Sequence, residues 1–330
     1  MAVVVTGSIA YDYIMSFPGH FKDHILMDKI NTLSLSFLVD SMRRERGGCA
    51  PNIAYNLALL GGRPRVMGTV GQDFADYRAW LEAHNVDTST VLTIDDDFTA
   101  SFFCSTDLDN CQIANFYTGA MAQACRLSFE GCASADIDLV VISPNDPGAM
   151  VQYVRECRAL GLAYMYDPSQ QIIRLEADDL IDGIRGAKIL IVNEYESEMI
   201  KKKTSLSDDE IHAAVETVIV THGEKGSVIT HRGERWEIPA VTPRVLAEPT
   251  GVGDAYRAGI IKGILHGYPW PVAGRLGSLA AVYVLEKHGT QNHSYTLDEF
   301  VARFREEFGR DPAFEPVLNH ILCLSKENNG

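Results

Sequence analysis

No Cys-x-x-Cys pair occurs among the seven cysteines of this 330-residue chain, and their number is odd. This pattern indicates reduced thiols rather than a disulfide framework, so we expect mostly buried cysteines in a cytoplasmic protein. The opening residues, MAVVVTGSIAYDY, contain neither a basic segment nor a long apolar run, so no signal peptide is expected. No apolar stretch reaches ~18 residues, which argues against a membrane span.

Basic residues are also scarce, with 29 Lys and Arg against 44 Asp and Glu and a formal net charge of −15. An acidic surface repels phosphate backbones and anionic lipid, so we expect neither nucleic acid nor a membrane as a partner. A small anionic ligand could bind only where local dipoles outweigh this overall field.

Two common glycine-rich nucleotide motifs are missing. The stretch TGVGDAY lacks the third glycine of the dinucleotide fingerprint, because position 256 is Tyr. No G-x-x-x-x-G-K-[ST] sequence occurs anywhere in the chain. These absences argue against a dehydrogenase and against a P-loop enzyme.

Short apolar runs alternate with helical patterns along the chain. The apolar runs lie at residues 2–7, 63–71, 136–143, 162–168, 187–194, 217–223 and 226–231. The helical patterns lie at residues 50–62, 73–86, 147–161, 207–216 and 253–267. This alternation predicts an α/β fold, a three-layer α/β/α sandwich with a mostly parallel central sheet. The length allows one or two domains, and we expect a single domain over residues 1–330.

Two segments, 13–46 and 95–120, interrupt the alternation. The sequence TASFFCSTDLDNCQIANFYTG predicts a β-hairpin whose turn is DLDN. Excursions of this kind often form a β lid over a binding site. The alternative is that they extend the edge of the main sheet.

The stretch EPTGVGDAYRAGI reads as a loop that enters a helix, with Thr250 or Gly251 near its N-cap. The two glycines would leave backbone N–H groups unshielded at a helix N-terminus, which is an anion site. Asp254 beside a bound phosphoryl group would suit a general base. The alternative is an ordinary capped helix in which this carboxylate complements the helix dipole.

The N-terminal part offers candidate substrate contacts. RGGCAPNIAYNLALLG places Gly47 and Gly48 before a helix that carries Asn52, and SIAYDY places Ser8 and Asp12 after the first strand. Polar groups at the carboxyl ends of parallel strands face the usual ligand crevice, where they could grip hydroxyl groups. The alternatives are an ordinary turn and a surface aspartate.

Two later segments could handle phosphate. IVNEYE ends a strand with Asn193 and Glu196, whose oxygens could hold hydrated Mg²⁺. VTHGEKGSVI joins two strands through Thr221, Gly223 and Gly226, which could approach a phosphate. The alternatives are a helix start and a hairpin turn.

Together these motifs resemble the ribokinase-like (PfkB) sugar and nucleoside kinases. GGCAPNIAYNLALLGG is similar to the family's N-terminal signature, EPTGVGDAY to its C-terminal signature, and NEYE and THGEKG to elements between them. The match spans roughly residues 3 to 305. DNCQIANFYTGAM, SPNDP, YDPSQQ and EKHGTQNH are most similar to the adenosine (nucleoside) kinase branch.

The resemblance implies a kinase that transfers the γ-phosphoryl group of ATP to the hydroxymethyl group of adenosine, with a sugar kinase of the ribokinase or fructokinase type as the alternative. Asp254 would be the base, and Glu196 would hold Mg²⁺ through water. The backbone of Gly251, Val252 and Gly253 would bind the phosphoryl group. The substrate contacts would be Ser8, Asp12, Gly47, Gly48, Asn52, Phe103, Gln112 and Phe116, and the ATP contacts Asn193, Glu196, Thr221, Gly223, Gly226 and Ser278.

Glu248 stands where the family usually has Asp, which leaves activation by K⁺ in doubt, and the resemblance allows a homodimer through the lid. A catalytically idle nucleotide-binding protein is a further alternative, against which the retained Asp254 argues. Outside these motifs, HFKDH (20–24) has metal-like spacing without a third ligand, KKKTS (201–205) indicates a solvated face, and the GTQN segment between His288 and His293 reads as a surface loop.

Overall fold

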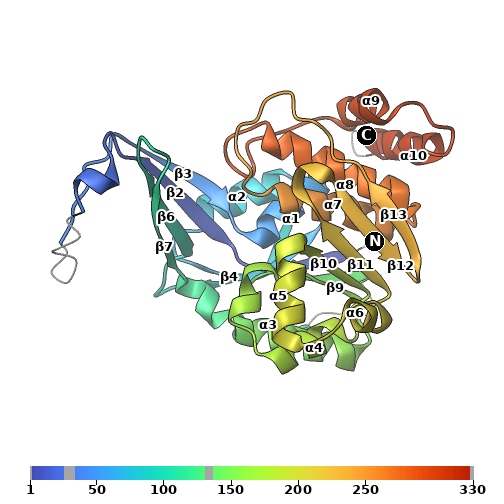
Figure 1. The fold of residues 1–330 in the computed structure, drawn as a ribbon, viewed down its shortest axis with the longest axis horizontal. Coiled ribbons are helices and arrows are strands. Elements are labelled where there is room, and N and C mark those ends of the chain that lie inside the picture. The colour runs from blue at the N-terminus through green and yellow to red at the C-terminus, as the bar shows by residue number, and fades with distance from the viewer. Residues whose placement is uncertain (1, 26–33, 131–136, 328–330) are drawn as a thin grey trace.

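The computed structural model describes residues 2–25, 34–130 and 137–327 (Figure 1). Its strands are β1 (Val3–Thr6), β2 (Ala10–Ser16), β3 (Ser41–Gly47), β4 (Arg65–Gly71), β5 (Asp87–Ile94), β6 (Ala100–Thr106), β7 (Gln112–Tyr117), β8 (Leu139–Ile142), β9 (Tyr164–Tyr166), β10 (Ile189–Asn193), β11 (Thr217–Thr221), β12 (Ser227–His231) and β13 (Glu234–Ile238). Its helices are α1 (Cys49–Leu59), α2 (Ala75–Ala83), α3 (Pro147–Leu160), α4 (Ala177–Ile184), α5 (Glu194–Thr204), α6 (Asp208–Ala214), α7 (Val252–Leu265), α8 (Trp270–Leu285), α9 (Leu297–Phe308) and α10 (Glu315–Glu327).

The central sheet has the strand order β13-β12-β11-β10-β9-β8-β1-β4-β5. Neighbours from β11 to β5 pair in parallel, whereas β12 pairs antiparallel with both β11 and β13. The predicted mostly parallel sheet is confirmed. Its apolar runs are short and continuous because these strands are covered on both faces.

The two helical layers are visible in the alternating side chains of β1. Val3 and Val5 lie in one buried cluster with side chains of α1, α2 and α7, while Val4 lies in another with side chains of α3 to α6. Figure 1 shows α7 and α8 on one side of the sheet and α3 to α6 on the other. The predicted three-layer sandwich is therefore confirmed.

Helices α7 and α8 pack with their backbones in close contact. A Cβ atom on Gly259 would lie 2.3 Å from the backbone nitrogen of Gly277, and one on Gly277 would lie 2.8 Å from the carbonyl oxygen of Tyr256. Small residues recur every four positions on α7, at Ala255, Gly259 and Gly263, which leaves one side of the helix open to this approach. The sequence does not predict α8, because a helix buried on most sides shows no amphipathic period.

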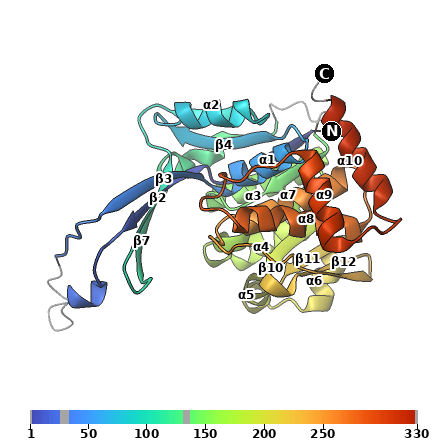
Figure 2. The ribbon, with the colours of Figure 1, turned by 90° about the horizontal axis from the view of Figure 1, so that it is seen from above.

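Strands β3, β2, β6 and β7 form a separate sheet, called the small sheet here. It projects from the main body in Figures 1 and 2, so the alternative of an edge extension is wrong. Strands β6 and β7 pair antiparallel around the DLDN turn, as predicted. Residues 26–33 of the predicted excursion 13–46 lie outside the described residues.

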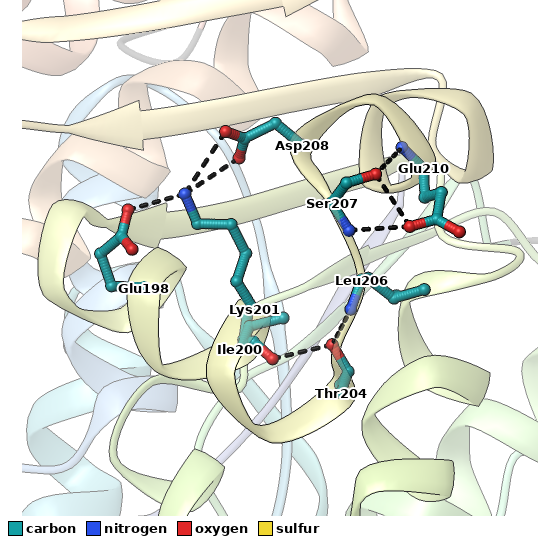
Figure 3. Close-up of polar contacts among 8 residues, drawn as sticks. All are labelled: Glu198, Ile200, Lys201, Thr204, Leu206, Ser207, Asp208 and Glu210. Carbon is teal, nitrogen blue, oxygen red and sulfur yellow. Dashed lines mark hydrogen bonds and ion pairs between the residues drawn. The ribbon is translucent and has the colours of Figure 1, made fainter.

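The lysines of KKKTS tie α5 to its surroundings and do not simply face solvent. Lys201 Nζ lies 2.6 Å from Glu198 Oε1 and 3.2 Å from Asp208 Oδ1 at the start of α6 (Figure 3). Lys203 Nζ donates to the carbonyl oxygens of Ile172 and Ile173, at 2.9 Å each. The Lys203 bonds stabilise the 3-10 turn Ser169–Ile173, which reaches the cleft described below.

The described cysteines are free thiols, but the expectation that most are buried is wrong. Cys104 and Cys157 are buried and Cys49 is half-buried, whereas Cys111, Cys125 and Cys323 are exposed. Cys132 lies outside the described residues. In the part of the chain that the structure describes, no helix combines the length and apolar character needed to span a membrane.

Candidate active site

A cleft of about 700 Å³ opens between the small sheet and the carboxyl ends of the parallel strands. Such ends are where open α/β sheets bind ligands. The cleft is lined by Ser8, Ala10, Asp12, Gly48, Cys49, Asn52, Phe102, Phe116, Met121, Pro144, Asp167, Ser169, Gln170, Gln171, Asn193, Glu196, Thr221, Pro249, Thr250, Gly251, Gly253, Asp254, Arg257 and Thr290. Residues from both ends of the chain therefore meet in one hollow.

Most of the predicted site residues line this cleft. They are Ser8, Asp12, Gly48, Asn52, Phe116, Asn193, Glu196, Thr221, Gly251, Gly253 and Asp254. The predicted residues that do not line it are Gly47, Phe103, Gln112, Gly223, Gly226, Val252 and Ser278. The second group has local structural explanations.

Phe103 lies on the wrong face of the small sheet for a cleft contact. Successive side chains of a strand point to opposite faces, so its neighbour Phe102 lines the cleft instead. Phe103 stacks on Tyr13 with ring centroids 4.8 Å apart and lines a second hollow of about 470 Å³. Gln112 is exposed at the far end of the hairpin, beside Thr106.

The glycines of THGEKG shape a hairpin turn between β11 and β12, which was the alternative interpretation. A Cβ atom on Gly226 would lie 2.0 Å from the carbonyl oxygen of Ile238, so packing against β13 explains this glycine. Ser278 is buried within α8, and Val252 packs with the cluster between α8 and α9. The predicted role of Val252 needs only its backbone.

The N-terminus of α7 offers free backbone donors to the cleft. Gly251 is the N-cap with a φ of 80°, and no side chain caps the helix. First-turn N–H groups of a helix have no intrahelical acceptor, and the dipole adds positive potential there. The N–H groups at Gly253 and Asp254 can therefore bind a phosphoryl group.

Asp254 lies beside these donors and accepts a hydrogen bond of 2.9 Å from Asn52 Nδ2 on α1. Burial raises the pKa of Asp254 to about 7, although Arg257 and the Asn52 bond oppose that shift. A carboxylate with a pKa near neutrality can accept a proton from an alcohol and later release it. The geometry fits a general base next to an anion site.

Arg257 and Asp167 form a buried ion pair that the sequence analysis missed. Arg257 follows Asp254 by three residues, so both side chains lie on one face of α7. Burial alone would lower the pKa of Arg257, but the carboxylates of Asp167 and Asp254 outweigh it and raise that pKa. Ser143 donates to Asp167 at 3.0 Å. Helical spacing could have revealed Arg257, but only the fold brings Asp167 to it.

Asn193 and Glu196 form the capping box of α5 and also line the cleft. Asn193 Oδ1 accepts from the Glu196 N–H, and Glu196 Oε2 accepts from the Asn193 N–H, both at 2.8 Å. Ser169 Oγ donates to Glu196 Oε1 at 3.0 Å. The helix start that stood as the alternative is therefore present, and the carboxylate still has lone pairs for water or a cation.

The donor set suits Mg²⁺ better than a softer metal, because carboxylates line the cleft and Mg²⁺ prefers oxygen ligands. Within the described residues, the one group of three close ligand atoms is elsewhere, at His20, Asp107 and Asp109. There Asp107 accepts from the N–H groups of Phe21 and Cys111, at 2.9 and 2.8 Å. These bonds give that group a structural role in the hairpin turn.

Asp12 reaches the cleft from β2. Burial first, and then the charges of Glu248 and Glu45, raise the pKa of Asp12 to about 6. A Cβ atom on Gly47 would lie 2.5 Å from Asp12 Oδ2, which explains the first of the paired glycines. Glu248 Oε2 accepts from the Gly289 N–H at 3.1 Å.

The GTQN segment is not a surface loop, contrary to its sequence interpretation. Thr290, Gln291 and His293 are each at most 2% exposed. Burial lowers the pKa of His293 to about 4, and its Nε2 lies 2.8 Å from Asn56 Oδ1. Thr290 lines the cleft, so this segment belongs to the site.

Comparison with known proteins gives concordant matches. A model of the pfkB family of carbohydrate kinases matches residues 3–297. The nucleoside kinase of Methanothermobacter thermautotrophicus is 30% identical over 316 residues, covering 94% of this chain and 97% of that protein. The nucleoside kinase of Burkholderia thailandensis in complex with inosine superposes with a TM-score of 0.84 at 40% identity, covering 94% and 99%. Its complex with ADP-inosine superposes with a TM-score of 0.82 at 41% identity, covering 94% and 97%.

Proposed function

Because the chain belongs to the pfkB family of carbohydrate kinases, which are phosphotransferases acting on hydroxyl groups, we propose that it is a nucleoside kinase that uses ATP to phosphorylate the hydroxymethyl group of adenosine. One observation carries the proposal: Asp254 lies at the uncapped N-terminus of α7 in a cleft shared with Asp12 and Asn52. The relatives named as nucleoside kinases support the acceptor class.

In this proposal each group acts on a different part of the transfer. The N–H groups at the start of α7 bind the transferring phosphoryl oxygens, where negative charge is concentrated. Asp254 takes the proton from the substrate hydroxyl as the oxygen attacks. Arg257 adds positive charge beside the site, and the Asp167 carboxylate holds it there.

Mg²⁺ would neutralise the ATP phosphates and orient them for transfer. Glu196 would hold it through water, since its two oxygens already accept from Asn193 and Ser169. Asn193 and Thr221 would contact the nucleotide from the ends of β10 and β11. We leave K⁺ outside the proposal, because Glu248 stands where the family usually has Asp.

The small sheet, with Ser8 before β2 and Met121 after β7, supplies the acceptor side of the cleft. Asp12 and Ser8 would bind the ribose hydroxyls, and Phe102, Phe116 and Met121 would cover the planar base. Aromatic faces stack well on nucleobases, which favours a nucleoside over a bare sugar. The small sheet would then act as the predicted lid.

A coupled ADP-release assay with Mg-ATP and adenosine, inosine, guanosine, cytidine, ribose or fructose tests the proposal. We expect nucleosides to exceed both sugars in kcat/KM, with adenosine highest. Inosine is the second candidate acceptor, because the Burkholderia thailandensis relative binds it. Turnover of sugars alone would replace the proposal with a ribokinase-type activity, and no turnover of any acceptor would refute it.

A homodimer through the small sheet is part of the proposal. All residues of β7 are exposed, and its Ile113 and Tyr117 share with Phe103 of β6 the face opposite the cleft. Apolar side chains gathered on one exposed strand are typical of an interface. Sedimentation of the purified protein, and of a Phe103→Asp and Ile113→Asp double variant, tests it. A wild-type monomer at micromolar concentration would contradict the proposal.

We also propose that the protein is cytoplasmic. Cys111, Cys125 and Cys323 are exposed free thiols, which persist in a reducing compartment. Fractionation of the source cells followed by immunoblotting tests this, and recovery in an oxidising compartment would contradict it.

A further inference from the structure

The side chain of Asn52 is held at both ends of its amide group. Its Nδ2 donates to Asp254 Oδ2 at 2.9 Å, and its Oδ1 lies 2.9 Å from Gln291 Nε2 and 2.8 Å from Thr290 Oγ1. Asn52 is 4% exposed. Although Asn52 was predicted to grip a substrate hydroxyl, its oxygen is already occupied by the protein.

The orientation of this amide matters for Asp254. The oxygen and nitrogen of an amide have nearly the same shape, so shape alone does not decide which one faces the carboxylate. The reversed orientation would place Asn52 Oδ1 against Asp254 Oδ2, and two acceptors repel each other unless the acid is protonated. Some neighbour must therefore fix the direction of the Asn52 amide.

Thr290 does not fix the orientation of the Asn52 amide. Its Oγ1 lies 2.7 Å from the carbonyl oxygen of Arg46 as well as 2.8 Å from Asn52 Oδ1, and the hydroxyl has a single hydrogen. If that hydrogen is donated to Arg46, the Thr290 oxygen can accept from Asn52 in its reversed orientation. Thr290 is compatible with both directions.

Gln291 and Tyr77 do fix the orientation of the Asn52 amide, through a backbone carbonyl. The Tyr77 hydroxyl donates to the carbonyl oxygen of Gly47 at 3.0 Å, and a carbonyl can only accept. Burial raises the pKa of Tyr77 well above its ordinary value, so the hydroxyl keeps its hydrogen. Its oxygen is then free to accept from Gln291 Nε2, which also donates to Asn52 Oδ1.

The Oε1 atom of Gln291 shows that this orientation of the Gln291 amide is energetically unfavourable. Gln291 Oε1 is buried and has no hydrogen-bond partner in the part of the chain that the structure describes. An unpaired buried acceptor is unfavourable and calls for a compensating role. The Nε2 side of the same amide supplies one, because its two bonds set the direction of Asn52.

We propose that Gln291 and Tyr77 are positioning residues of the phosphoryl transfer, which through Asn52 keep an N–H donor on Asp254 so that its carboxylate stays ionised and aimed into the cleft. The proposal rests on the proposed role of Asp254 as the base. Neither Gln291 nor Tyr77 lines the cleft, so both act through Asn52 and not on the substrate.

The other ionisable groups that face Asp254 stay in place when these two residues change. They are Arg257 on α7, Asp167 after β9 and the Cys49 thiol on α1. Burial raises the pKa of Cys49 well above its ordinary value, so that thiol is neutral. Asp12, another cleft carboxylate with a raised pKa, lies near Tyr77, but the Tyr77 hydroxyl is neutral, so its removal changes no charge beside Asp12. A change in the acidic limb of the variants therefore reports Asp254 and the Asn52 amide.

The test is the pH dependence of kcat/KM for Tyr77→Phe and Gln291→Met. Losing the donor favours protonated Asp254, so the acidic limb should move to higher pH by about one unit. We expect kcat at pH 6.5 to fall by about 10-fold and to recover largely at pH 8.5, with little change in the KM for ATP. A merely structural role would lower activity at every pH.

Tyr55→Phe is the matched control. Tyr55 is also a buried tyrosine whose hydroxyl donates to a backbone carbonyl, that of His293 at 2.6 Å, but it does not touch the Asn52 side chain. Its acidic limb should coincide with the wild type. Thermal melting checks that each variant folds. If Gln291→Met does not fold, the pH profile of Tyr77→Phe alone tests the proposal.

An unmoved limb in a folded Tyr77→Phe variant overturns the proposal, and so does an equal shift in Tyr55→Phe. Asp254→Asn separates this failure from that of the proposed function. If Asp254→Asn keeps near-normal turnover, the base role itself is wrong. If it is inactive while the limb of Tyr77→Phe stays in place, only the positioning role fails.

Discussion

Helix α1 and strand β7 face the same cleft but differ in how their side chains are held. Residues Ala50–Leu57 of α1 are all buried, and Asn52 among them bonds to Asp254. Every residue of β7 is exposed, and Phe116 retains 49% of its surface. The end of the cleft at Asp254, called the fixed end here, is thus held by buried hydrogen bonds. The end at β7, called the open end, offers exposed aromatic surface that a bound ligand could cover.

The largest effect should come from the fixed end. Asp254→Asn keeps the shape of the side chain but removes the proton acceptor, so turnover should fall by ~10²-fold or more. Binding of ATP, measured by titration calorimetry, should stay largely intact because the N–H groups of α7 remain. Near-normal turnover would show that Asp254 is not the base and that phosphoryl transfer does not depend on this end of the cleft.

The open end should affect substrate affinity more than turnover. Phe102→Ala removes an aromatic wall of the cleft, so the KM for the nucleoside should rise by about 10-fold with a smaller change in kcat. Phe103→Ala is the control, because this neighbour faces the second hollow. Equal effects of the two substitutions on KM would mean that both faces of the small sheet bind substrate.

At the fixed end, the buried Asp254 should make the stability of the fold decrease as the pH rises. The pKa of Asp254 is about 7 in the fold and ordinarily 3.8, so the folded state binds this proton more tightly than the unfolded chain. The wild type therefore loses stability between about pH 4 and pH 7, and Asp254→Asn does not. At pH 8 the variant should melt about 3 °C or more above the wild type, and the gap should narrow at pH 5. A gap that does not depend on pH would contradict this account.

The smallest effect should come from the support of Glu196. Ser169→Ala removes the bond to Glu196 Oε1 but leaves the capping box of α5 intact. The Mg²⁺ concentration for half-maximal activity should rise by about 3-fold. The effect is small because the lost bond orients the carboxylate and does not contact the ion. Unchanged Mg²⁺ dependence would argue against a role of Glu196 in holding the ion.

The sequence predicts the layers of the fold and much of the cleft for a simple reason. Buried parallel strands show as short apolar runs, and Gly251 and Asp254 stand at a helix start that local rules can identify. The choice between Phe102 and Phe103 depends on which face of β6 meets the cleft, and two adjacent phenylalanines show no apolar alternation that would reveal it.

Other parts of the site depend on contacts across the chain. The GTQN segment is polar and reads as a loop, yet its Gln291 is buried, where Nε2 donates to Asn52 Oδ1 and to the Tyr77 hydroxyl. Asp167 meets Arg257 across 90 residues of sequence, so no local pattern links them. Polar residues that pair only in the folded state cannot be distinguished from surface residues by composition.

The close packing of Gly259 against Gly277 limits which parts of the enzyme can move during a reaction cycle. A side chain at either glycine would collide with the other helix, so we expect α7 and α8 to move together and the N-terminus of α7 to keep its place in the main body. We therefore expect any closure around bound reactants to come from the small sheet, where the start of β2, the end of β3 and the start of β6 pair at Ala10, Gly47 and Ala100. Stiffening that junction should slow the capture and release of ligands without altering the groups that perform the transfer.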